Sequence, residues 1–153
     1  MRLLTVDRSP EFHPDYQSVT DVPSNMIDTV LALEVIEHIP LAQFDEFIDE
    51  ILRAMKPTGR LVISTPNAAY IGSIWEGDMT HVHAYGAEDL AAYLDLRGFR
   101  CQIFRVAWRS ERARFKERLR LIAAKILTRG ILQLDYARGV VVLAERRETT
   151  TEG

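Results

Sequence analysis

One continuous stretch, residues 27–67, restricts the fold of this 153-residue chain more than any other part. It carries two short apolar runs, VLAL at residues 30–33 and LVIS at residues 61–64, and a segment of helical periodicity lies between them. Near-continuous apolar runs joined by an amphipathic helix are typical of strands that are buried on both faces of a parallel sheet. The pattern therefore predicts a βαβ unit.

The helix of this unit is expected over residues 41–55. Pro40 introduces it, and the sequence KPTG at residues 56–59 ends it and turns the chain into the next strand. Acidic side chains fill one face of the helix, whereas apolar side chains recur at i, i+3 and i+4 and form a stripe on the other. The stripe consists of Leu41, Phe44, Ile48, Ile51, Leu52 and Met55.

Polar side chains follow both apolar runs. Glu34, Glu37 and His38 come after the first run, and Asn67 comes after the second. Ligands of open α/β sheets bind at the carboxyl edge of the strands. On a helical turn, the spacing of Glu34, Glu37 and His38 puts two carboxylates and an imidazole on one face, and such a set can hold a divalent metal. We expect these residues to share one cleft with Asn67 and with His81 from the following segment.

Alternating strands and helices continue on both sides of the central unit. Strands are expected at residues 3–6, 101–106 and 139–144, the last of them antiparallel, and a helix at residues 86–96 with Gly98 as its C-terminal cap. The pattern predicts an α/β fold: a three-layer sandwich around a mostly parallel sheet, with an antiparallel strand near the C-terminal edge.

The stretch between Asn67 and Gly86 is long for a connection in a compact domain and has no clear period. We expect it to form a lid that faces the substrate. Its aromatic, acidic and imidazole side chains are Tyr70, Trp75, Asp78, His81, His83 and Tyr85. For His83 a place in the core is favoured, whereas for His81 a functional role is favoured.

Length and composition limit the class of protein. The chain has 47% hydrophobic residues, enough for one domain over residues 1–145, whereas residues 146–153 lack apolar side chains and are expected to be a disordered tail. Its net charge of −3 gives no reason to expect nucleic acid as a partner. A single cysteine, Cys101, excludes an internal disulfide and suits a cytoplasmic location. Residues 109–129 predict a basic amphipathic helix, which either contacts an anionic membrane surface or packs on its own domain.

Three motifs, EVIEH at residues 34–38, KPTGRLVISTPN at residues 56–67 and THVHAY at residues 80–85, resemble those of class I S-adenosylmethionine-dependent methyltransferases. The resemblance implies a Rossmann-like fold and methyl transfer to a hydroxyl or similar nucleophile. It also implies that Asp7 binds the cofactor ribose, that Asp21 meets the adenine amine and that Glu34 lies near the cofactor. His38 or His81 would orient the nucleophile or act as its base. The other interpretation of Asp7 and Asp21 is that both are turn residues.

Two narrower resemblances concern the metal and the acceptor. Small-RNA 2′-O-methyltransferases have a similar acid-x-x-acid-His cluster and a later histidine, which implies a divalent metal held by Glu34, Glu37, His38 and His81. The same EVxEH motif also occurs in methyltransferases without a metal, where the acid and the histidine stabilise the turn. The run from Asp78 to Phe99 resembles methyltransferases of bacterial polysaccharide and lipid-linked sugar pathways, which implies a saccharide or small-molecule acceptor.

The family's first strand, glycine-rich turn and first helix have no counterpart in the sequence, and none of the eight glycines falls in a G-x-G pattern. Binding of S-adenosylmethionine is therefore expected to be weak or absent. Open edges on residues 3–6 and 30–33 predict that these strands pair directly, that the chain forms a homo-oligomer, or that a partner chain completes the sheet. A non-catalytic, methyltransferase-like binding subunit is the alternative function.

Overall fold

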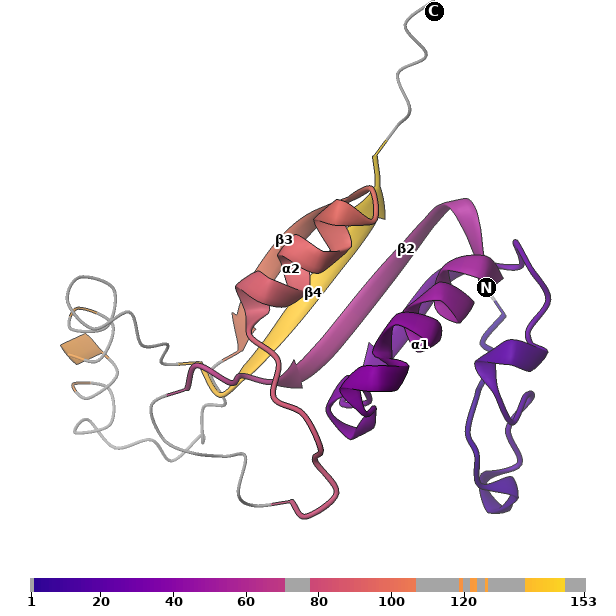
Figure 1. Ribbon diagram of the computed structural model, residues 1–153, viewed down its shortest axis with the longest axis horizontal. Helices are drawn as coiled ribbons and strands as arrows, with labels where there is room; N and C mark the ends of the chain where they lie inside the picture. Colours follow the sequence, from indigo (N-terminus) through magenta and orange to yellow (C-terminus); the bar gives the residue numbers. More distant parts are fainter. Residues whose placement is uncertain are drawn as a thin grey trace, which may run out of the picture.

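The computed structural model describes residues 2–70, 78–106 and 137–147, together with the isolated positions 119, 122, 123 and 126. These parts contain one four-stranded sheet and two α-helices (Figure 1). The elements are β1 (Ile27–Leu33), α1 (Leu41–Ala54), β2 (Met55–Pro66), α2 (Ala87–Leu96), β3 (Phe99–Val106) and β4 (Gly139–Arg146).

The strand order β1-β2-β4-β3 confirms the predicted sheet. β1 and β2 are parallel, with Val30 opposite Leu61, and they enclose α1 in the chain, so the predicted βαβ unit is present. β4 is antiparallel to both of its neighbours, β2 and β3. Three of the four strands consequently run in one direction, and β4 is the antiparallel strand near the C-terminal edge.

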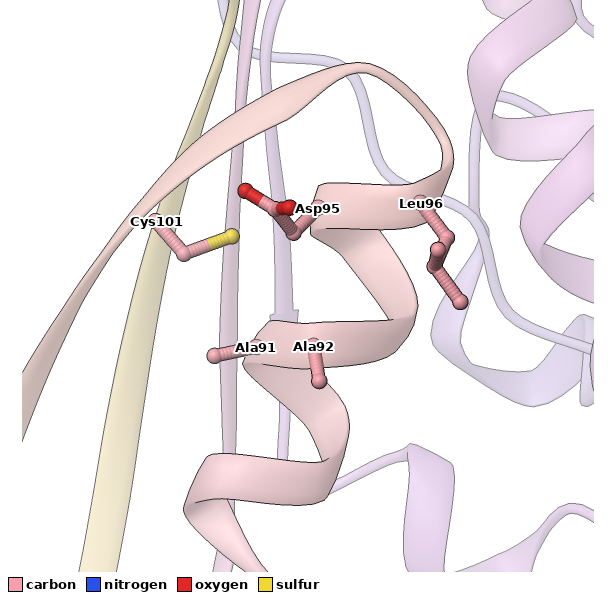
Figure 2. A pocket seen from close by; sticks show the side chains of 5 residues that line it. All are labelled: Ala91, Ala92, Asp95, Leu96 and Cys101. Atoms are coloured by element: carbon pink, nitrogen blue, oxygen red, sulfur yellow. The ribbon is translucent and has the colours of Figure 1, made fainter.

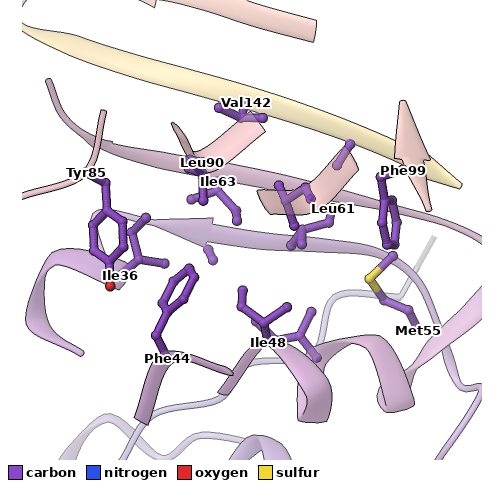
Figure 3. Packing of buried hydrophobic residues seen from close by; sticks show 14 residues of the cluster. Ile36, Phe44, Ile48, Met55, Leu61, Ile63, Tyr85, Leu90, Phe99 and Val142 are labelled. Carbon is purple, nitrogen blue, oxygen red and sulfur yellow. The ribbon is translucent and has the colours of Figure 1, made fainter. Parts of the chain in front are cut away.

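The core lies between the sheet and the two helices, which share one face of it (Figure 3). Ile48 of α1 and Leu90 of α2 belong to the same buried cluster as Leu61, Ile63 and Val142 of the sheet. These strand residues alternate along β2 and β4, as expected for one face of a pleated sheet.

The opposite face of the sheet, which we call the outer face, differs from the expectation that the strands are buried on both faces. Leu31 and Leu33 of β1 are 57% and 53% exposed, and Phe104 of β3 is 49% exposed. Because α1 and α2 pack on the same face, no helix among the described residues covers these side chains. Among the described residues, two of the three predicted layers are therefore present, the sheet and one layer of helices.

The N-terminal segment corrects a second expectation. Residues 3–6 form no strand: Val6 makes a single isolated bridge with Tyr16, and within the described residues β1 pairs with β2 alone. The predicted direct pairing of residues 3–6 with residues 30–33 is therefore wrong. Hydrogen bonds from Thr5 to the carboxylate of Asp15, from the backbone N–H at 2.8 Å and from the hydroxyl at 3.1 Å, close this segment on itself.

The C-terminal elements follow the prediction closely. Gly98 has the left-handed φ of +85° that suits glycine after a helix end, and Arg97 is the C-cap of α2. β4 continues through Arg146, and the N–H of Arg147 donates to the Gly98 carbonyl at 3.0 Å, so regular structure extends past the expected boundary at residue 145. Residues 148–153, the rest of the predicted tail, lie outside the described residues.

The predicted basic helix at residues 109–129 also lies largely outside the described residues. Leu119, Ile122 and Ile126 are described there as helical positions with exposed side chains. Among the helices that the structure describes, none is long and apolar enough to span a bilayer.

Truncating Ile48 tests the core. Its side chain is fully buried between α1 and the sheet, so Ile48→Ala should lower the free energy of unfolding by about 2–5 kcal/mol in urea titrations, because a cavity remains. Leu41 lies on the same helix and in the predicted stripe but is 60% exposed, so Leu41→Ala is a matched control with an expected change within about 0.5 kcal/mol. Equal losses in the two variants would contradict this packing.

Candidate functional site

The carboxyl end of β1 turns sharply at Glu34, whose φ of +52° is in the left-handed region. Non-glycine residues adopt this region at a cost of about 1–3 kcal/mol, and such positions often occur at functional sites. Ser64 of β2 holds the turn: its carbonyl and its hydroxyl oxygen each accept from the Glu34 N–H at 3.1 Å. The Ser64 hydroxyl in turn donates to Glu34 Oε1 at 2.6 Å.

The turn directs Glu37 into the protein. Glu37 belongs to a short 3-10 helix, η3 (Ile36–His38), and its side chain is 0% exposed. Neither carboxylate oxygen has a hydrogen-bond partner among the described residues. Burial, with a smaller contribution from the charge of Glu34, raises the pKa of the Glu37 carboxyl. An isolated carboxylate in the interior is costly, so this position requires an explanation.

Two buried hydroxyl groups lie in the surroundings of this carboxylate. The Thr65 hydroxyl lies near the Glu37 carboxylate and partly offsets the rise in its pKa. The distance and angle between the two groups do not satisfy the criteria for a hydrogen bond. The Tyr85 hydroxyl is also buried without a partner among the described residues, and burial together with the charge of Glu37 raises the pKa of Tyr85 to about 12. Glu37, Thr65 and Tyr85 thus form a small polar region in the protein interior near the carboxyl ends of β1 and β2.

His38 is exposed, and its ring is oriented by Thr80. The ring nitrogen Nδ1 lies 3.1 Å from the Thr80 carbonyl and 3.0 Å from the Thr80 hydroxyl. The Thr80 hydroxyl donates its hydrogen to Asp78 Oδ1 at 2.6 Å, so its oxygen accepts from His38, as the carbonyl does. Nδ1 therefore carries the proton, and Nε2 has the lone pair of the neutral ring.

His81 brings the predicted second imidazole to the same place. The rings of His38 and His81 are in edge contact, with centroids 4.9 Å apart. His81 Nε2 lies 3.7 Å from Asp78 Oδ2, and hydrogen bonds from Thr80 lower the pKa of the Asp78 carboxyl. Possible ligand atoms of Glu37, His38 and His81 all lie within 4.8 Å of one another. We call these three residues the Glu-His-His cluster.

The cluster holds three of the five residues expected in one cleft. Glu34 is outside it, because the left-handed turn separates Glu34 from the 3-10 helix and Ser64 engages its carboxylate. The assumption of one continuous helical turn was therefore wrong. Asn67 is buried, and its amide donates to the Ala137 carbonyl at 2.9 Å while its side-chain oxygen accepts from the Ala69 N–H. Asn67 braces the chain next to β4.

The predicted cofactor residues Asp7 and Asp21 are both exposed: Asp7 follows the bridge residue Val6, and Asp21 is the last residue of a short 3-10 helix, η2 (Val19–Asp21). Asp7 Oδ1 accepts from the Ser9 N–H at 2.7 Å, and Asp21 accepts from the Ser18 N–H at 3.2 Å within a capping box. Each carboxylate thus has a local structural role, and each retains further acceptor positions at the surface.

The described part of the predicted lid is anchored to the cluster through its backbone. The Val82 and His83 N–H groups donate to the Glu37 carbonyl at 2.8 and 3.2 Å. Tyr85 packs in the core against Phe44, and His83 contacts Tyr85. Trp75 lies outside the described residues. Residues 80–85 are therefore a wall of the site, attached to the turn after β1.

A separate groove of about 500 Å³ lies between α2 and β3 (Figure 2). Its lining is mostly apolar, and burial raises the pKa of the half-buried Cys101 thiol, which makes the thiol less reactive at neutral pH. The residues that line it are Ala91, Ala92, Asp95, Leu96 and Cys101. None belongs to the Glu-His-His cluster, so this groove is no part of the candidate site.

Sequence reasoning placed Thr65 after the second strand and Tyr85 in the lid, but it missed that both lie beside Glu37, and it missed the role of Thr80. Thr80 had a local signal, because Asp-x-Thr spacing favours the side-chain turn that Asp78 and Thr80 form. Thr65 and Tyr85 had no such signal, since their position beside Glu37 depends on contacts between distant segments.

Comparison with known proteins places the chain in a family. Residues 2–102 match the family model of a methyltransferase domain. An S-adenosylmethionine-dependent methyltransferase from Archaeoglobus fulgidus superposes with a TM-score of 0.69 at 20% identity, over 92% of this chain and 74% of that chain. A methyltransferase from Thermotoga maritima superposes with a TM-score of 0.61 at 11% identity, over 86% of this chain and 63% of that chain.

A third neighbour comes from the complex of a Haloferax volcanii methyltransferase with its Trm112 activator, with a TM-score of 0.57 at 12% identity, over 92% of this chain and 69% of that chain. No curated protein sequence matches this chain. At these identities the neighbours support the fold, whereas the family model covers most of the described sheet and both helices. The chain belongs to the class I S-adenosylmethionine-dependent methyltransferase family.

Proposed function

We propose that this protein transfers the methyl group of S-adenosylmethionine to a hydroxyl or similar nucleophile of a small molecule or saccharide. The observation that carries the proposal is the Glu-His-His cluster at the carboxyl ends of β1 and β2, where α/β proteins bind their ligands. The acceptor class rests on the likeness of residues 78–99 to methyltransferases that act on sugars.

His38 is the proposed base. Methylation of a hydroxyl forms a bond between the acceptor oxygen and the methyl carbon, breaks the bond from that carbon to sulfur, and releases S-adenosylhomocysteine and a proton. His38 Nε2 can accept this proton, because Thr80 keeps the other ring nitrogen protonated and the side chain is exposed. His81, in ring contact with His38, would orient the nucleophile.

Asp7, Asp21 and Glu34 are the proposed residues for the cofactor. Exposed carboxylates fit the hydroxyl and amine donors of an adenosyl group, and each of the three keeps acceptor positions beyond its local hydrogen bond. S-adenosylmethionine supplies the activated methyl group when it is bound. Because no glycine pair of the G-x-G type is present in the sequence, we expect its affinity to be low.

A specific observation favours the alternative function of a binding subunit. The N–H of Glu34 points to β2, and backbone groups alternate in direction along a strand. The N–H and C=O groups of Thr29, Leu31 and Leu33 therefore point away from β2. They form a strand edge that no described strand covers. Leu31 and Leu33 also expose apolar side chains on the outer face. Such an edge pairs readily with another chain, either a second copy or a partner that completes the sheet.

Replacing His38 tests the catalytic proposal. His38→Gln should lower kcat for S-adenosylhomocysteine formation by about 10²- to 10⁴-fold, because a positioned base is lost. The assay uses a panel of monosaccharides and small alcohols at a high concentration of S-adenosylmethionine. His13→Asn is the control, since His13 is exposed in an N-terminal turn. The backbone of His13 is left-handed, a conformation that asparagine tolerates. Equal rates in wild type and His38→Gln would refute this role.

Calorimetry and light scattering distinguish the two functions. We expect a self-associating chain that binds S-adenosylmethionine more weakly than the micromolar range. Leu31→Lys should shift the association equilibrium toward monomer, because a lysine on the exposed edge opposes pairing. Leu41→Lys is the matched control, since Leu41 is equally exposed but lies on α1. A wild-type chain that is monomeric and binds the cofactor in the micromolar range or tighter would contradict the expectation.

A further inference from the structure

We propose that two copies of this chain associate by antiparallel pairing of β1 with β1 of the second copy, about a two-fold axis at Leu31. The inference deepens the alternative function, a subunit that pairs through an open strand edge, and it rests on that function. It commits to a second copy of the same chain as the partner and gives the register of the contact. Methyl transfer is not required for it.

The first observation is that the edge of β1 lacks the features that normally keep strand edges apart. Soluble proteins protect an edge with lysine, proline, a bulge or a covering element. Residues 29–33 of β1, TVLAL, contain no charge and no proline, and they pair with β2 in unbroken register. Among the described residues no strand covers the other side of β1. Such an edge favours pairing with another strand.

The second observation determines the register. The outward-pointing backbone groups belong to Thr29, Leu31 and Leu33, and an irregularity between Ile27 and Thr29 ends the regular edge there. An antiparallel pair centred on Leu31 sets Thr29 of each copy opposite Leu33 of the other, so all three residues gain partners. Any other antiparallel register leaves at least one of the three without a regular partner.

The third observation is the apolar surface beside the edge. A two-fold axis perpendicular to the sheet keeps the outer faces of both copies on one side, and the same patch of each copy then meets itself. Leu31 and Leu33 are 57% and 53% exposed in the single chain. In the pair, Leu31 contacts Leu31 of the second copy, and Leu33 contacts Thr29 of the second copy. Apolar cross-strand contacts of this kind stabilise a sheet.

The charges at the two ends of the edge are complementary. At the amino end of β1, Lys56 Nζ lies 2.7 Å from Asp28 Oδ1, and both side chains are partly exposed. At the carboxyl end, Glu34 is exposed. Antiparallel pairing brings the amino end of one copy beside the carboxyl end of the other. Lys56 therefore lies near Glu34 of the second copy and offsets the repulsion between that carboxylate and Asp28.

The second copy thereby contributes to the candidate site. Glu34 begins the turn after β1 and is a proposed cofactor residue, and its carboxylate accepts from Ser64 on one oxygen. A lysine from the second copy adds a cation at this turn. The dimer thus connects the open edge of the sheet with the edge at which α/β proteins bind their ligands.

Cross-linking of the full chain tests the two-fold axis. In a Cys101→Ser background, Leu31→Cys should form a disulfide-linked dimer about 10-fold faster under mild oxidation than Phe104→Cys, because facing residues of antiparallel strands lie at a Cα separation that a disulfide spans. Phe104 is a matched control, since it is 49% exposed on the same outer face but belongs to β3. Equal rates in the two variants would overturn the proposal.

Mixtures of two single-cysteine chains test the register. Thr29→Cys and Leu33→Cys chains, both in the Cys101→Ser background, are oxidised separately and as an equal mixture. The proposed register predicts a cross-linked heterodimer in the mixture and little cross-linked dimer from either chain alone. Cross-linking of either chain alone at the rate of the mixture contradicts this register. Circular dichroism and urea titration of the reduced variants verify that each one is folded.

Light scattering on variants with an unchanged β1 tests the charge contact without cysteines. Lys56→Gln and Glu34→Gln should each raise the dissociation constant of the dimer about 2- to 5-fold at low salt, as expected for an exposed ion pair. The double variant should lose no more than the weaker single variant, because the two residues act on each other. Additive losses refute the contact.

Arg100→Gln is the matched control for the two charge variants. Arg100 is 75% exposed on β3, far from the β1 edge in the strand order, so its replacement should leave the dissociation constant unchanged. A wild-type chain that stays monomeric up to millimolar concentration overturns the whole proposal.

The dimer and the methyl-transfer proposal fail in different ways. A chain that cross-links through Leu31 but transfers no methyl group supports the dimer and refutes the catalytic proposal. A monomeric chain that transfers methyl groups refutes the dimer alone. A monomeric chain whose β1 edge binds a different protein refutes the choice of a second copy.

Discussion

The parallel pairing of β1 with β2 is the interaction on which the rest of this structure depends. The register sets Leu33 opposite Ser64, so both strands end at the same edge and Ser64 reaches the residue after β1. The left-handed turn at Glu34 can persist because two hydrogen-bond acceptors from one neighbouring residue hold it. A shift in register by one residue would remove Ser64 from the turn and direct Glu37 elsewhere.

The interior beyond this turn is unusual because stability alone does not explain it. Glu37, Thr65 and Tyr85 place a carboxylate and two hydroxyl groups in a buried region without hydrogen-bond partners among the described residues. An apolar side chain at position 37 would avoid the desolvation penalty. Locally unfavourable choices of this kind are expected where a protein binds a ligand or carries out chemistry. The neighbouring imidazoles, each oriented by Thr80 or Asp78, agree with this interpretation.

The sheet has one well-covered face and one exposed face among the described residues. α1 and α2 bury Leu61, Ile63 and Val142, whereas Leu31 and Leu33 remain exposed beside an open strand edge. In an α/β protein both faces of a mostly parallel sheet are normally covered. The exposed apolar face and the edge are continuous at β1, so a single additional strand and helix would cover both.

The sequence by itself predicted the strands and helices from residue 27 onward, the parallel βαβ unit, and Glu37, His38 and His81 as members of a larger shared site, because apolar periodicity and the residues at strand ends are local signals. It did not determine that residues 3–6 form only an isolated bridge or that Leu31 and Leu33 stay exposed, since both depend on which segments pack against which. The tertiary structure alone separated Glu34 from Glu37: a hydrogen bond from Ser64, 30 residues away, stabilises a left-handed residue where the spacing predicted one helical face. It also brought Thr65 and Tyr85 to Glu37, because burial and long-range contacts, and not neighbours in the sequence, define the surroundings of a side chain.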